Sequence, residues 1–66
     1  MFLFQCGVDN LYALSTEATG RNIPLTRCPA GWRLRGDLSG SEHEADFIAP
    51  VRKAKRFGYC YLVVTD

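Results

Sequence analysis

The segment from residue 46 to residue 65 constrains the fold of this chain more than any other part of the sequence. It begins with an amphipathic stretch of helical period, passes through Gly58, and ends in a run whose two faces are both apolar. At about 100° per residue, the apolar side chains of the first part share one side, which predicts a helix with one buried face. That predicted face consists of Phe47, Ile48, Val51, Ala54 and Phe57.

The limits of this helix depend on a proline and a glycine. A proline costs about 3 kcal/mol in a helix interior but is tolerated in the first turn. Because of Pro50, we predict a helix that begins at residues 46–49, with Asp46 as its N-cap. A longer helix capped at Ser41 is the alternative. Gly58 is the expected end, because glycine adopts the left-handed conformation of a helix C-cap without strain.

Four strands accompany this helix. They are predicted at residues 2–6, 11–16, 32–38 and 59–64. The first two strands are joined by a turn at residues 7–10 and form a hairpin. Residues 17–29 contain two prolines, a glycine and an asparagine, which favour an irregular loop.

The order strand, strand, loop, strand, helix, strand predicts an α+β fold in a single small domain over residues 1–66. We expect a four-stranded, mostly antiparallel sheet with one helix packed on one face. A last strand that is apolar on both faces usually lies inside a sheet and not at its edge. Two strand orders stay open. Either residues 32–38 run parallel to residues 59–64 through a right-handed crossover, or the first three strands form a meander.

Period-two alternation predicts which side chains the helix covers. In the last strand, Tyr59 and Tyr61 are assigned to the open face, because tyrosine hydroxyls tolerate water better than leucine and valine side chains do. The residues expected under the helix are Trp32, Leu34, Leu38, Cys60, Leu62 and Val64.

The open face is predicted to form a binding surface for a partner subunit or for stacked bases. There the aromatic pair Tyr59 and Tyr61 would lie beside the side chains of Arg33 and Arg35. A second basic group projects from the outer side of the helix. The candidate binding residues are Tyr59, Tyr61, Arg33, Arg35, Arg52, Lys53 and Arg56.

Residues 55–62 partly resemble the RNP1 signature of RRM domains, in which aromatic residues on a strand stack bases. Arg56 stands where that family has glycine, and Leu62 stands where it has an aromatic residue. A solvated helix face followed by core aromatics explains the same residues, and we prefer that interpretation because the net charge is only +1. The matching residues are Lys55, Phe57, Gly58, Tyr59 and Cys60.

Cys6, Cys28 and Cys60 are odd in number and widely spaced. Since no secretion signal is recognised, we expect reduced thiols in a cytoplasmic protein. No Cys-x-x-Cys or His-x-x-x-His pair is present, so neither a metal nor a cofactor is expected. Cys28 follows Arg27, and whether its thiol is reactive stays open. No apolar run approaches the ~18–20 residues of a membrane span, so no membrane partner is expected.

Four short pieces of the sequence look like a pattern of small uncharacterised bacterial α+β proteins. The resemblance covers most of the chain and implies a small α+β domain, but it implies no activity and no functional residue. The pieces are Leu11-Tyr-Ala-Leu-Ser15, Thr19-Gly-Arg-Asn-Ile-Pro24, Gly31-Trp32 and Phe57-Gly-Tyr59.

These observations favour a function in binding. We expect a non-catalytic protein-interaction module, with homodimerisation as a way for a small core to bury more surface. The alternative is single-stranded nucleic-acid binding through the basic helix and the open aromatic face. One candidate acid–base group is His43 with Glu42, Glu44 and Asp46. No nucleophile motif or metal-binding spacing accompanies it, so no enzyme activity is expected.

Overall fold

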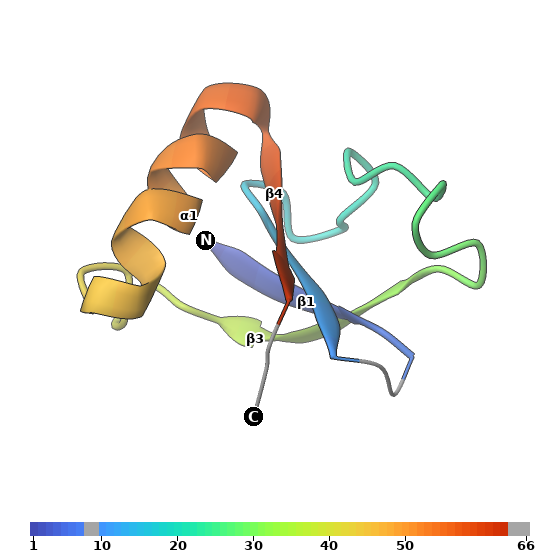
Figure 1. The fold of residues 1–66 in the computed structure, drawn as a ribbon, viewed down its shortest axis with the longest axis horizontal. Coiled ribbons are helices and arrows are strands. Elements are labelled where there is room, and N and C mark those ends of the chain that lie inside the picture. Colours follow the sequence, from blue (N-terminus) through green and yellow to red (C-terminus); the bar gives the residue numbers. More distant parts are fainter. Residues whose placement is uncertain (8–9, 64–66) are drawn as a thin grey trace.

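The computed structural model describes residues 1–7 and 10–63 of the chain. It confirms the predicted architecture, a four-stranded antiparallel sheet with one helix packed against it (Figure 1). Val64 and the middle of the turn at residues 7–10 lie outside the described residues. The elements are β1 (Phe2–Cys6), β2 (Leu11–Ser15), β3 (Trp32–Asp37), α1 (Ala45–Phe57) and β4 (Tyr59–Val63).

The strand order is β3-β1-β2-β4, and every neighbouring pair is antiparallel. The β1/β2 hairpin therefore lies in the centre, and the other two strands form the edges. Both strand orders that we considered are wrong, because β3 joins β1 rather than β2 and does not lie beside β4. The expectation that the last strand lies inside the sheet is also wrong. Residues 59–62 of this strand are half-buried on both faces, but no described strand pairs with its outer edge.

Helix α1 begins one residue before the predicted range. The carbonyl of Glu44 accepts hydrogen bonds from the N–H groups of Phe47 and Ile48, at 2.8 and 3.2 Å. Glu44 therefore occupies the N-cap position, although its side chain makes no capping bond. The predicted cap at Asp46 is wrong, and so is the longer helix from residue 41. Pro50 lies in the second turn, where its missing N–H removes one helical hydrogen bond.

Gly58 ends the helix as predicted. Its φ is 92°, in the left-handed region, and its N–H donates to the carbonyl of Ala54 at 2.6 Å. A Cβ added at this position would lie 3.0 Å from Nδ2 of Asn22. The turn between α1 and β4 therefore requires glycine both for its conformation and for the approach of a neighbouring side chain.

The helix packs on one face of the sheet, over β2 and β4. Leu14, Val51 and Ala54 are buried there. The assignment of Cys60 and Leu62 to this core is confirmed. The predicted helix face is too broad, since the helix lies near one edge of the sheet. Its flanking residues are exposed, Ile48 to 46% and Phe57 to 62%. The half-buried residues around this core are Met1, Leu3, Leu38, Phe47, Cys60 and Leu62.

A β-bulge in β3 explains why one face assignment failed. Leu3 pairs with Gly36 and Phe4 pairs with Leu34, so Arg35 is an extra residue in β3. The extra residue breaks the period-two alternation. Leu38 consequently reaches the helix side, whereas Trp32 packs on the opposite face. Leu34 is 53% exposed. The expectation that Trp32 and Leu34 lie under the helix is therefore wrong.

The face opposite the helix is covered by residues 16–31, which we call the covering loop (Figure 1). Ile23 of this loop is buried against Phe4 and Ala13. Gly20 is also buried, and a Cβ there would lie 2.7 Å from the ring of Phe4. Nε1 of Trp32 donates a hydrogen bond to the carbonyl of Pro24 at 3.1 Å. The expected open aromatic face is therefore largely closed.

A disulfide between Cys6 and Cys28 fastens the covering loop to the end of β1. The expectation of three reduced thiols is wrong for these two, and buried Cys28 is no reactive loop thiol. The two cysteines are 22 residues apart in sequence and meet only because the loop folds across the sheet. Cys60 is free and half-buried. Because disulfides persist in oxidising environments, this bond removes the basis for the expected cytoplasmic location.

Ser15, Asn22 and Gly58 form a polar cluster that we call the Asn22 clamp. Oγ of Ser15 donates to Oδ1 of Asn22 at 2.5 Å, and Nδ2 of Asn22 donates to the Gly58 carbonyl at 2.6 Å. The N–H of Glu17 donates to Oγ of Ser15 at 3.0 Å. Ser15, Asn22 and Gly58 come from three of the four short sequence pieces singled out above, at residues 11–15, 19–24 and 57–59. In this structure these three residues join β2, the covering loop and the end of α1.

We predict that Gly58→Ala destabilises the protein by about 1–2 kcal/mol, because alanine is strained at positive φ and its Cβ presses on Asn22. Gly58→Asn should cost less, since asparagine adopts this conformation more easily. Gly40→Ala is the matched control, because a Cβ there meets open space. Urea unfolding of the three variants measures the differences. A neutral Gly58→Ala would show that this helix end is wrongly described.

The disulfide generates a second prediction. The double variant Cys6→Ser/Cys28→Ser should lose about 3 kcal/mol of unfolding free energy, because the cross-link restricts a loop of 22 residues in the unfolded chain. Reductant should lower the unfolding midpoint of the wild type but leave that of the double variant unchanged. Alkylation followed by mass spectrometry should modify Cys60 alone before reduction and all three cysteines afterwards. Three reactive thiols in the untreated native protein would contradict the disulfide.

Candidate protein-interaction groove

A groove of about 620 Å³ runs between α1 and the outer side of β4. A smaller hollow of about 270 Å³ lies beside it and also includes Tyr59. Both are lined by Lys53, Phe57, Cys60 and Tyr61, so we treat them as one feature, the α1/β4 groove. The other lining residues are Ala49, Pro50, Arg52, Arg56 and Leu62.

The outer edge of β4 borders this groove. Within the described part of the chain, β4 pairs only with β2. The N–H of Thr16 donates to the Gly58 carbonyl at 3.2 Å, and the next register pair is Ser15 with Tyr59. Hydrogen-bonded and non-hydrogen-bonded pairs alternate in an antiparallel ladder. The residues whose N–H and C=O groups point away from β2 are therefore Tyr59, Tyr61 and Val63.

The rim of the groove is basic. Arg52, Lys53 and Arg56 are exposed, and no residue among 1–7 and 10–63 forms an ion pair with them. The guanidinium of Arg56 lies 5.3 Å from the centre of the Phe57 ring. In the part of the chain that the structure describes, no acidic side chain lines the groove. The groove therefore combines an apolar floor with positive charge that no described carboxylate neutralises.

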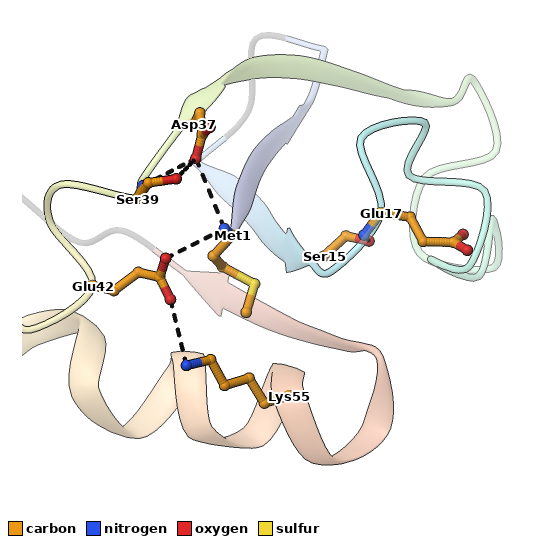
Figure 2. A network of polar contacts seen from close by, with 7 residues as sticks. All are labelled: Met1, Ser15, Glu17, Asp37, Ser39, Glu42 and Lys55. Carbon is orange, nitrogen blue, oxygen red and sulfur yellow. Dashed lines mark hydrogen bonds and ion pairs between the residues drawn. The ribbon is translucent and has the colours of Figure 1, made fainter.

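Lys55, the fourth basic residue of this helix segment, has a different role. Its Nζ lies 3.7 Å from Oε1 of Glu42, whose Oε2 lies 3.4 Å from the amino group of Met1 (Figure 2). The same amino group lies 3.8 Å from Oδ1 of Asp37. Hydrogen bonds from Oγ and N–H of Ser39 lower the pKa of Asp37 below its ordinary value, and the amino-terminal charge adds to this effect. This network joins α1 to β3 and is separate from the groove.

Tyr59 and Tyr61 lie on the face opposite the helix, as predicted, but their rings already have partners. The Tyr61 ring centre lies 5.8 Å from that of Trp32 and 5.4 Å from that of Tyr59. The guanidinium of Arg27, from the covering loop, lies 4.9 Å from the Tyr61 ring centre. The arginine beside this aromatic cluster is therefore Arg27. Sequence reasoning missed it because nothing local shows where the loop folds.

The structure divides the seven candidate binding residues into two groups. Arg52, Lys53 and Arg56 lie with Tyr59 and Tyr61 around the groove at the β4 edge. Arg33 and Arg35 are exposed on β3, at the opposite edge of the sheet. The expectation that these two arginines lie beside the tyrosines is wrong, because two central strands separate them. The apolar floor of Ala49, Pro50, Phe57, Cys60 and Leu62 was not predicted as part of a site.

The described residues give little support for an acid–base site, a metal site or a membrane span. His43 is exposed and lines none of the described cavities. Among residues 1–7 and 10–63, no group of three histidine, cysteine or acidic side chains is placed to hold a metal ion. The same residues contain no helix that is long and apolar enough to cross a membrane.

Comparisons with protein families, curated proteins and solved structures found no match to this chain. The functional interpretation therefore rests on the geometry of the α1/β4 groove.

Proposed function

We propose that this chain is a non-catalytic protein-interaction module that accepts an extended segment of another polypeptide along β4. The observation that carries the proposal is the free edge of β4 beside an apolar groove. An added strand would pair with the outward N–H and C=O groups of Tyr59, Tyr61 and Val63, while its side chains entered the groove. Such strand addition gains affinity from backbone hydrogen bonds and specificity from pockets for alternate side chains.

A comparison of the two sheet edges supports this proposal. Proteins usually protect edge strands with charges, prolines or bulges that prevent further pairing. The β3 edge carries a bulge at Arg35 and the charged neighbours Arg33 and Asp37. The β4 edge has an unbroken register and no charged residue or proline. Val63 on this strand is 65% exposed. One edge is therefore protected, and the other is suited to pairing.

Homodimerisation is one form of the proposed function, since a second copy offers the same free strand. Single-stranded nucleic-acid binding gains less support. Base stacking needs free aromatic faces, but the Tyr61 ring already contacts Trp32, Tyr59 and Arg27. A nucleic acid also cannot continue the backbone hydrogen bonding of β4. The arrangement thus favours a polypeptide ligand.

We predict that Val63→Pro abolishes binding of extended peptides and that Val63→Thr preserves it. Proline removes an outward N–H without breaking a bond to β2, and it is tolerated on edge strands. Random heptapeptides would be selected against the wild-type protein, and the enriched peptides would then be measured against both variants. In the wild type, bound peptide should slow amide exchange of Tyr59, Tyr61 and Val63, a readout that does not depend on how the proline variant folds.

Two results would count against this function. The first is the absence of any enriched peptide together with a monomeric protein in sedimentation at micromolar concentration. The second is peptide binding that leaves amide exchange along β4 unchanged.

A further inference from the structure

We infer that the segment accepted by β4 is acidic, with carboxylates at alternate positions, and that it belongs to a different protein rather than to a second copy of this chain. The inference rests on the proposed function and adds the chemistry of the partner to it.

Charge complementarity is the first step. The groove presents Arg52, Lys53 and Arg56, and among residues 1–7 and 10–63 no acidic side chain lines it. Among the described residues, Glu42 is the one acidic side chain that forms an ion pair with this stretch of helix, and it contacts Lys55 outside the groove. A strand lying along β4 would pass under these three cations, which form no ion pair with any described residue. Carboxylates on its helix-facing side would neutralise them, whereas lysines or arginines there would be repelled.

The spacing of the cations indicates the spacing of the carboxylates. Arg52 and Arg56 are four residues apart and project from the same side of α1. Four residues of helix correspond to about 6 Å along the axis. Two residues of extended strand correspond to about 6.6 Å, and side chains two residues apart share a face. Two carboxylates at alternate positions therefore match the two arginines, and carboxylates on adjacent residues do not.

The same charges disfavour a second copy. In an antiparallel β4-to-β4 dimer, the two-fold axis runs perpendicular to the joined sheet, so both helices lie on the same side. The basic rims of the two copies would then face each other across the axis. The residues of β4 carry no acidic side chain to compensate this charge. Like charges at an interface disfavour association, so this edge suits an acidic partner better than itself.

The test uses three acetylated and amidated peptides of equal length. The first, Thr-Val-Glu-Val-Glu-Val-Thr, has alternate glutamates. The second replaces both glutamates by lysine, and the third, Thr-Val-Val-Glu-Glu-Val-Thr, places them side by side. Affinity is measured by calorimetry at low and at physiological salt, and occupancy of the groove is followed as protection of Cys60 from alkylation. The alternate-glutamate peptide should bind at least about tenfold more tightly than the other two peptides. Its affinity should be lower at physiological salt than at low salt, because salt screens the charge pairs.

Two charge variants separate a local effect from the effect of net charge. Arg52→Glu/Arg56→Glu should reverse the preference between the glutamate and lysine peptides. Arg33→Glu/Arg35→Glu changes the net charge equally but at the opposite edge, and it should preserve the preference. All four substituted residues are exposed, so both variants should fold. Thermal unfolding checks this directly.

Each failure has a distinct meaning. Equal binding of the glutamate and lysine peptides, with amide exchange slowed along β4, would overturn the inference and leave strand addition intact. A concentration-dependent dimer that Val63→Pro abolishes would identify a second copy as the partner and overturn the inference. Protection of Cys60 by oligothymidine at the same affinity as by the alternate-glutamate peptide would point to nucleic acid and overturn it too. Loss of all peptide binding along β4 would overturn the proposed function itself.

Discussion

The side-chain amide of Asn22 holds the parts of this structure together. It accepts a hydrogen bond from Ser15 in β2 and donates one to the carbonyl of Gly58, where α1 ends. Ser15 is fully buried, and a buried hydroxyl without a partner would destabilise the fold. The two hydrogen bonds of the Asn22 amide therefore connect the covering loop to both the sheet and the helix. The Gly58 carbonyl also accepts the N–H of Thr16, so the start of β4 is fixed by the same cluster.

The covering loop makes this sheet unusual for its size. A small sheet with one helix normally leaves its second face to water, and its strands then alternate between apolar and polar residues. Here the disulfide and Ile23 hold the loop against the second face, so residues 59–62 of β4 are half-buried on both faces although the strand lies at an edge. A strand with apolar side chains on both faces indicates that both faces are covered. It does not indicate that both edges of the strand are paired with neighbouring strands. The two properties coincide in most proteins, but they separate in this chain.

Local patterns therefore predicted the local structure well. The helical period, the glycine stop and the positions of the strands follow from side chains that are close in sequence, and so does the placement of Cys60 and Leu62 under the helix. The strand order, the disulfide and the Arg27–Tyr61 contact depend on where an irregular loop folds, which no local period describes. The bulge at Arg35 had the same effect within one strand: because of a single extra residue, Leu38 lies under the helix as predicted, whereas Trp32 lies on the opposite face. Only part of the candidate site was predicted. The basic residues follow from the helical period, but the free edge of β4 depends on the strand order.

The two groups of exposed arginines show how position decides the role of a charge. Arg33 and Arg35 lie within an edge strand, next to a bulge, where their charges and the broken register oppose the addition of another strand. Arg52 and Arg56 lie on the helix beside the other edge. There they leave the backbone of β4 free and contribute positive charge that the carboxylates of the proposed acidic strand would neutralise. The turn at Gly58 sets the distance between these cations and that backbone, and the Asn22 clamp holds this turn. The contacts that stabilise the fold thus also determine the geometry of the groove.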